Sequence, residues 1–208
     1  MLNRWTMVTA AAMVCASSVL AQDQATPTLK VGDKAPALTV ENWVKGKEVK
    51  KFEEGKVYVV EFWATWCGPC IKGIPHLTEL QKEYKDKGVT IIGVASSERG
   101  NDAKSKLVGV ENFVRKQGKE MEYTVAFDAD RSMSKDWMAA AGRNGIPCAF
   151  LVGPDGKIAW IGHPANGLDA ELKKATASKR VGSKSSDDTK QVASSSDGSS
   201  TTKSTDRK

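Results

Sequence analysis

The pattern of apolar positions predicts strands that alternate with helices along the middle of the chain. Near-continuous apolar runs, typical of strands buried on both faces, occupy 57–63 and 89–95. Between them, apolar residues recur at helical spacing over 71–87, with Pro75 inside the helix and Gly88 after it. A strand, a helix and a strand in this order indicate a parallel pair joined by a right-handed crossover.

Shorter apolar segments complete the predicted order of elements. A Gly-Pro-Asp-Gly sequence at 153–156 separates two of them and predicts an antiparallel hairpin at one edge of the sheet. The other predicted elements are a helix over 107–118, a strand over 123–127, a helix with Met133 and Trp137, strands over 148–152 and 157–161, and a helix over 168–174. This alternation predicts an α/β sandwich with a mixed central sheet.

An extension is predicted ahead of the first buried strand. Leu38 and Val40 begin an evenly spaced apolar series, and a Lys-Gly-Lys sequence at 45–47 can return the chain toward Val49 and Phe52. We therefore expect a small N-terminal β-hairpin laid against the main sheet.

The two ends of the chain differ from its middle. Residues 1–21 contain Arg4, then a short apolar stretch, then small residues, which is typical of a secretory signal peptide. The alternative is an uncleaved segment that anchors the protein in a membrane. Residues 176–208 are rich in Ser, Thr, Lys and Asp, so we expect them to be disordered. The folded domain is predicted over 22–175, in a protein exported to the periplasm or cell envelope.

Charge adds little to this picture. The 208 residues carry a formal charge of +6, but Lys and Arg alternate with acidic residues along the chain. Because there is no dense basic run with interleaved aromatic residues, we expect no nucleic-acid partner.

The chemistry is concentrated where the first buried strand meets its helix. Cys67 and Cys70 are two residues apart there, and removal of the signal peptide leaves only one other cysteine, Cys148. A cysteine at the start of a helix is stabilised as a thiolate by unpaired N–H groups and by the helix dipole. The second thiol can attack a mixed disulfide before the substrate leaves. The pair therefore predicts a redox centre.

The motifs resemble those of a known family. The sequence FWATWCGPC at 62–70, the helix proline Pro75, the Gly-Ile-Pro at 145–147 and the glycines of the last hairpin are similar to those of the thioredoxin superfamily. The opening VGDKAP at 31–36 and the additional helix and strand over 107–127 resemble the exported branch with the TlpA-type and ResA-type thiol–disulfide oxidoreductases, also grouped as redoxins. The resemblance covers about 29–174.

This resemblance implies roles for individual residues. Cys67 would be the exposed nucleophile, and Cys70 the buried thiol that resolves the mixed disulfide. Pro147 would be a cis-proline facing the disulfide, with the backbone of Ile146 pairing to the substrate. Glu61 falls where the family keeps a buried carboxylate that accepts the proton of the second cysteine. The alternative for Glu61 is an acidic residue at a strand end that reaches solvent.

The resemblance also implies a reaction and its partners. Trp66, Gly68 and Pro69 would shape the surface that docks the substrate. The Gly-Pro pair resembles that of reducing thioredoxins, so we expect the protein to reduce substrate disulfides without a further cofactor. Such a reductase outside the cytoplasm implies an electron donor in the membrane. Family analogy makes apocytochrome c one expected substrate.

The residues around the cysteine pair bear on two other functions, a thiol peroxidase and a metal-transfer module. Peroxiredoxins carry a proline and a hydroxyl residue ahead of their reactive cysteine, and Val60 and Ala64 occupy those positions here. A metal-transfer site could use the zinc-like spacing of the cysteine pair, with Cys148, His76 or His163 as further ligands. The redox interpretation is favoured over both.

Cys148 and His163 each have two possible roles. Cys148 follows Pro147 and is either a small buried residue or a third thiol that exchanges with the pair. His163 is either an ordinary loop residue or, because it follows the last strand, a neighbour of the active site.

Overall fold

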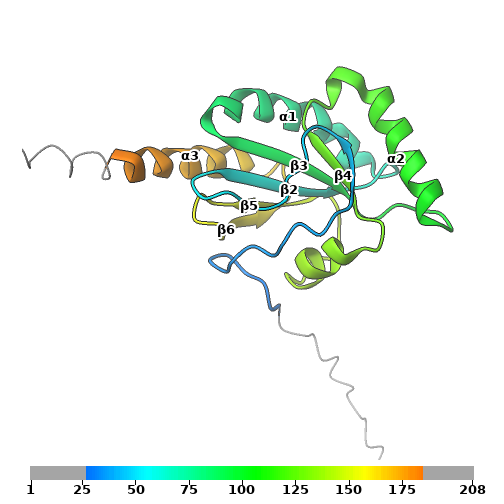
Figure 1. Cartoon of the computed structure of the whole chain (residues 1–208), viewed down its shortest axis with the longest axis horizontal. Coiled ribbons are helices and arrows are strands. Elements are labelled where there is room, and N and C mark those ends of the chain that lie inside the picture. The colour runs from blue at the N-terminus through cyan, green and yellow to red at the C-terminus, as the bar shows by residue number, and fades with distance from the viewer. Residues whose placement is uncertain (1–26, 185–208) are drawn as a thin grey trace, which may run out of the picture.

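The computed structural model describes residues 27–184, which form a six-stranded mixed sheet with helices on both faces (Figure 1). The strands are β1 (Asn42–Lys45), β2 (Val57–Trp63), β3 (Val89–Ala95), β4 (Thr124–Phe127), β5 (Cys148–Val152) and β6 (Ile158–Gly162). The α-helices are α1 (Gly68–Tyr84), α2 (Ala103–Gln117) and α3 (Leu168–Lys184). Short helical segments are η1 (Lys85–Lys87), η2 (Gly118–Glu120) and a π-helix, η3 (Ser134–Ala139). The predicted mixed α/β sandwich is confirmed.

The strand order is β1-β4-β3-β2-β5-β6, so β2 lies in the interior of the sheet. It pairs in parallel with β3 and antiparallel with β5, and all seven of its residues are buried. The predicted right-handed βαβ unit is the pair β2 and β3 with α1 between them. This arrangement brings the carboxyl ends of β2 and β3 to the same edge of the sheet, where α1 begins.

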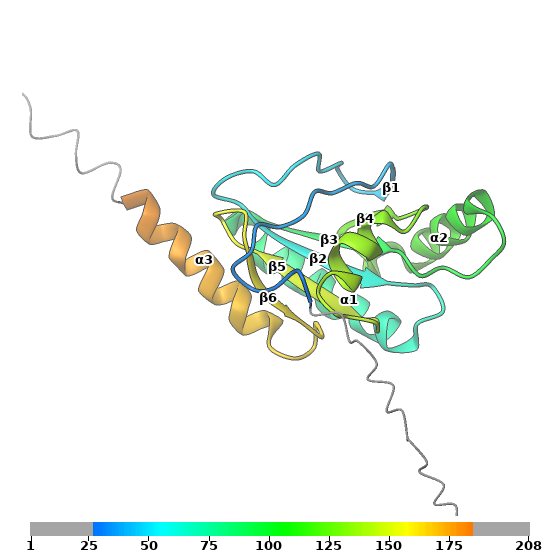
Figure 2. The same cartoon turned by 90° about the horizontal axis from the view of Figure 1, so that it is seen from below.

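Two hydrophobic cores lie on the two faces of the sheet. On one face, α1, α2 and α3 pack against alternate residues of β2 that include Val57, Val59 and Trp63. On the other face, η3 and the N-terminal segment cover Tyr58, Val60 and Phe62. Figures 1 and 2 show α1 and α2 on one side, while the blue N-terminal segment runs along the opposite side. The alternation along β2 therefore decides which side chains can meet α1.

The predicted N-terminal hairpin is wrong. Its first half is β1, but β1 pairs antiparallel with β4 at the edge of the main sheet. The segment that was expected to return as a strand packs its apolar side chains into the second core instead, where Phe52 contacts the rings of Tyr58 and Trp137. The free backbone groups on the edge of β4 pair with β1, and the segment after β1 packs its apolar side chains against the second core without pairing as a strand.

The last helix extends beyond the predicted end of the domain. Expected over 168–174, it continues to Lys184, past the domain boundary predicted at 175. Residues 175–181 contain no Gly or Pro, and the Thr176 hydroxyl donates to the carbonyl oxygen of Leu172. A disordered tail was predicted from 176, and its remainder over 185–208 lies outside the described residues. The predicted signal peptide, 1–21, lies outside them too.

The helix expected around Met133 and Trp137 has a wider turn than predicted. Its backbone hydrogen bonds join residues five positions apart, as in the bond from the Ala140 N–H to the carbonyl oxygen of Lys135. This π-helix directs Met133 and Trp137 into the second core. Such turns are frequent beside functional sites.

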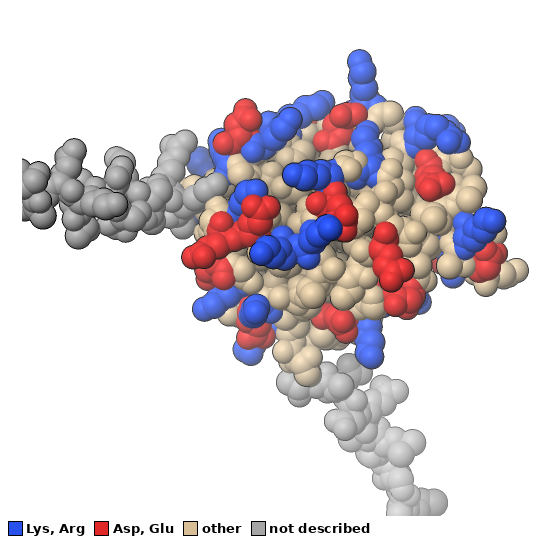
Figure 3. Space-filling model, in the orientation of Figure 1, with Lys and Arg blue, Asp and Glu red and all other residues tan. Residues whose placement is uncertain are grey.

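None of the helices within 27–184 is long and apolar enough to span a membrane. Lys and Arg alternate with Asp and Glu over the face in Figure 3, which therefore presents no continuous basic surface.

Candidate active site

Cys67 and Cys70 form a disulfide at the start of α1, with an S–S distance of 2.01 Å. Cys67 is the N-cap residue, and its Sγ accepts the backbone N–H of Cys70 at 3.2 Å. Pro69 fits the first turn of the helix because a backbone N–H there would have no partner within the helix. The cysteine pair therefore lies at the positive end of the α1 dipole, as its spacing predicted.

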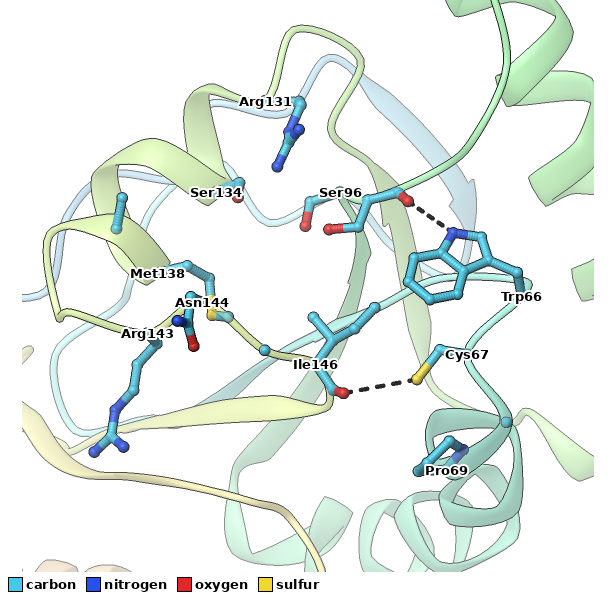
Figure 4. Close-up of a pocket in the computed structure, with 14 residues that line it drawn as sticks. Trp66, Cys67, Pro69, Ser96, Arg131, Ser134, Met138, Arg143, Asn144 and Ile146 are labelled. Carbon is cyan, nitrogen blue, oxygen red and sulfur yellow. Dashed lines mark hydrogen bonds between the residues drawn. The ribbon is translucent and has the colours of Figure 1, made fainter.

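The expected exposure of Cys67 is wrong in this disulfide-bonded form. Cys67 is only 3 % exposed, and Cys70 is buried to almost the same extent. The cover comes from the loop before β5, since the carbonyl oxygen of Ile146 lies 3.9 Å from the Sγ of Cys67 (Figure 4). The peptide bond between Ile146 and Pro147 is cis.

A pocket of about 750 Å³ opens beside Cys67. Trp66 is 43 % exposed at its rim, and its indole N–H donates to the carbonyl oxygen of Ser97 at 2.8 Å. The guanidinium of Arg99 stacks on the Trp66 ring at 4.1 Å. Gly68, Pro69 and Ile146 also line the pocket, so these four residues predicted to bind substrate share one surface.

Glu61 lies behind the disulfide, on the face of β2 that meets α1. It is 2 % exposed, so the alternative of a strand-end acid that reaches solvent is wrong. Burial raises the pKa of Glu61 from 4.5 to about 8. In the disulfide-bonded form the carboxyl group is therefore mostly protonated at neutral pH.

A second pocket, of about 470 Å³, connects Glu61 with Cys70 and Pro147. His163 lines the same pocket, so the loop after β6 does reach the active-site region. The Nδ1 atom of His163 accepts the backbone N–H of Ala165 at 3.2 Å, which orients the ring.

Cys148 belongs to the opposite face of the sheet. It is buried in the second core and makes no disulfide, whereas Cys70 and Glu61 lie on the α1 side of β2. Burial raises the pKa of the Cys148 thiol to about 11. In this form Cys148 is thus a buried thiol separated from the pair by the sheet.

Of the further metal ligands proposed from sequence, His76 and His163 line the pocket that contains Cys70, whereas Cys148 lies in the second core. Within 27–184, no three His, Cys, Asp or Glu side chains are placed to hold a metal ion. His76 instead lies 3.5 Å from the carboxylate of Asp169.

Sequence reasoning missed the loop after β3. Glu98 accepts hydrogen bonds from the Thr65 backbone N–H at 2.7 Å and from the Thr65 hydroxyl at 2.6 Å. These bonds tie the loop that carries Ser96 and Ser97 to the segment ahead of Cys67. Because parallel strands end at the same edge of a sheet, the predicted pairing of β2 and β3 could have found this loop.

Comparisons with known proteins agree with this geometry. The Redoxin family profile matches residues 30–178. The thiol–disulfide oxidoreductase ResA of Bacillus thuringiensis is 34 % identical over 152 residues, which cover 71 % of this chain and 80 % of ResA. Protein FixW of Rhizobium leguminosarum is 35 % identical over 135 residues, and the match spans only 61 % of its length.

A solved structure of a putative thiol:disulfide interchange protein DsbE from Chlorobium tepidum superposes with a TM-score of 0.57 and 30 % identity. The match covers 71 % of this chain and 99 % of that one. Sequence, fold and the cysteine pair at the start of α1 thus agree, and the chain belongs to the redoxin family of thioredoxin-like proteins, where it is similar to ResA.

Proposed function

We propose that this protein is a thiol–disulfide oxidoreductase that reduces protein disulfides outside the cytoplasm. The observation that carries the proposal is the Cys67–Cys70 disulfide, placed at the N-terminus of α1 between the docking pocket and buried Glu61. The family relationship supports the general reaction. The reducing direction and the location rest on the Gly-Pro pair and on the predicted signal peptide.

Reduction begins with the thiolate of Cys67. In the reduced protein, the Cys70 N–H that now points at Sγ can donate to the thiolate, and the α1 dipole favours the negative charge. Attack on a substrate disulfide forms one S–S bond between Cys67 and the substrate and releases the other substrate sulfur as a thiolate. The exposed ring of Trp66 and the backbone of Ile146 border the space where the substrate chain would lie.

Cys70 then resolves the mixed disulfide. Its thiol must lose a proton to attack the Sγ of Cys67, and the Glu61 carboxylate shares a pocket with Cys70. A proton accepted there stays in the oxidised product, because the pKa of Glu61 is about 8 in that form. The products are the Cys67–Cys70 disulfide and a substrate with two thiols.

Trapping tests this order of events. Cys70→Ser should leave Cys67 in a stable mixed disulfide with an insulin chain, detected as an added mass that dithiothreitol removes. Cys67→Ser should trap nothing and abolish insulin reduction, whereas Cys148→Ser should behave as the unmodified protein. Recovery of trapped substrate on Cys148, or none on Cys67, would contradict the proposal.

The direction of electron flow is tested by the reduction potential of the pair. A value of about −270 mV, as in thioredoxin, supports a reductase, and a value of about −120 mV would make the protein an oxidant. A reductase in an oxidising compartment must be reduced again, so we propose an electron donor in the membrane. Disulfide-bonded apocytochrome c is the first protein substrate to assay.

The proposed location is the periplasm or cell envelope. Cell fractionation combined with the mass of the mature protein tests this proposal. Loss of the first 21 residues supports a cleaved signal, and a full-length, membrane-bound form supports the anchor instead. Recovery of full-length protein in the cytoplasm would refute both.

A further inference from the structure

The pocket beside Cys67 has an unusual polar lining. Arg131 and Arg143 are both among its lining residues, although Figure 4 shows the Arg143 guanidinium extending away from Cys67, and no carboxylate lines the pocket. Within the part of the chain that the structure describes, neither arginine lies within salt-bridge distance of an acidic side chain. The pocket wall therefore carries positive charge that the protein itself does not neutralise.

A buried hydroxyl in the same wall has no partner. Ser96 is almost fully buried after β3, and its Oγ makes no hydrogen bond to any described residue. In Figure 4 the Ser96 oxygen points toward the pocket, which Arg131 also lines. An unpaired buried hydroxyl is costly, and a ligand oxygen that accepts a hydrogen bond from it would remove that cost.

The backbone directs Arg131 to this position. Arg131 has a φ of 63°, in the left-handed region that side-chain-bearing residues seldom adopt. It immediately precedes the turn into η3, and Figure 4 shows its side chain extending between Ser134 and Ser96. Residues held in this conformation are frequent at ligand sites.

Neighbouring acidic residues are already engaged elsewhere. Asp128 accepts the backbone N–H groups of Met133 and Ser134 at the start of η3, and Glu98 accepts both bonds from Thr65. Asp130, next to Arg131, likewise accepts the backbone N–H of Ser132, so Arg131 has no carboxylate partner among the described residues.

We infer that this pocket is a carboxylate-binding subsite that selects disulfides with an acidic residue beside the reactive cysteine. The inference rests on the disulfide reduction proposed above. Arg131 supplies the charge, since a guanidinium binds a carboxylate through two parallel N–H donors. The Ser96 hydroxyl supplies a further donor. Cys67 and Arg131 line the same pocket, so the residue beside the substrate cysteine would lie within reach of Arg131.

The test uses three cyclic disulfide peptides that differ only in one residue beside a cysteine, which is Glu, Gln or Lys. The pre-reduced protein is mixed with each peptide, and single-turnover reduction is followed after acid quenching. We expect the Glu peptide to react about threefold to tenfold faster than the Gln peptide at low salt. The Lys peptide should be the slowest, and high salt should narrow the differences.

Two variants assign this preference to the subsite. Arg131→Gln should bring the Glu-to-Gln ratio close to one, whereas Lys116→Gln, a control on the surface of α2, should preserve it. Ser96→Ala should lower the ratio without lowering the urea midpoint, because the removed hydroxyl has no partner in the free protein.

Glutathione disulfide, compared with uncharged hydroxyethyl disulfide, shows whether a small acidic disulfide suffices. If glutathione disulfide is preferred and Arg131→Gln abolishes the preference, the subsite also accepts small molecules. If only the Glu peptide is preferred, the subsite serves protein substrates.

Two results would overturn the inference. One is equal rates for the three peptides with the unmodified protein, together with no preference for glutathione disulfide. The other is an Arg131→Gln variant that slows all peptides equally, which would mean that Arg131 acts on the Cys67 thiolate. If the unmodified protein reduced none of the disulfides, the proposed function itself would fail.

Discussion

Replacement of Glu61 by Gln should make the stability of the disulfide-bonded protein less dependent on pH. Burial raises the pKa of this carboxyl group from 4.5 to about 8. Between these two values the folded protein keeps the proton, while the unfolded chain releases it. The contribution of Glu61 to the free energy of unfolding should therefore fall as pH rises from 4.5 to about 8 and should stay constant above that range. Gln keeps the shape of the side chain but cannot ionise.

The size of the effect follows from the displaced pKa. Between pH 4.5 and about 8, each pH unit lowers the free energy of unfolding of the unmodified protein by about 1.4 kcal/mol, because one proton is released on unfolding. Between pH 4.5 and pH 7, the free energy of unfolding of the Glu61→Gln variant should therefore increase by about 3 kcal/mol relative to that of the unmodified protein. Above pH 8 this relative increase in the free energy of unfolding should stay constant at about 5 kcal/mol.

Urea unfolding of both oxidised proteins at pH 5, 6, 7 and 8 measures this difference. The oxidised form is used because Cys70 then cannot titrate with Glu61. Glu79→Gln, an exposed change on α1, is the matched control. Its difference in free energy of unfolding from the unmodified protein should not grow with pH. A constant difference between the Glu61→Gln variant and the unmodified protein at all four values would refute a buried carboxyl group with a raised pKa.

Two other predictions concern packing and reactivity. Gly93→Ala should destabilise the fold by about 1–3 kcal/mol in urea unfolding, because its added Cβ would lie 2.9 Å from the Tyr123 ring. The same change at Gly109, on open helix surface, should raise stability by about 0.5–1 kcal/mol, and equal losses at both sites would contradict the packing argument. Cys148, with its pKa near 11, should react with iodoacetamide at pH 8 at least tenfold more slowly in the folded oxidised protein than in urea. Rapid labelling of the folded protein would show that the thiol is accessible.

Several features could be predicted from the sequence alone. The apolar runs of β2 and β3, the helical spacing between them and the turn before β6 predicted the mixed sheet correctly. The cysteine pair was predicted at a helix start, and the structure places it there. These features depend on neighbouring residues, since periodicity reports which side of an element is buried and turn residues report where it ends.

Other features required contacts between distant segments. The partner of β1 is β4, about eighty residues further along the chain, and no local pattern distinguished that pairing from a hairpin. The extension of α3 to Lys184 was missed because composition there favours solvent without excluding a helix. The two faces of the sheet separate Cys148 from Cys70, although the sequence left exchange between them open.

At the active site, the sequence predicted the chemistry, whereas the tertiary structure decided burial and electrostatic environment. The residue types and spacing of Cys67 and Cys70 were enough to predict thiol chemistry, because a cap and a first turn are local structures. Whether Glu61 was buried or exposed depended on α1, the loop at Pro147 and the loop at His163, which all close over it. The arginine-lined pocket likewise joins the ends of β2 and β3 with the segments on either side of η3. Burial and electrostatic environment are properties of the whole packed chain, so they emerge only when these segments are brought together.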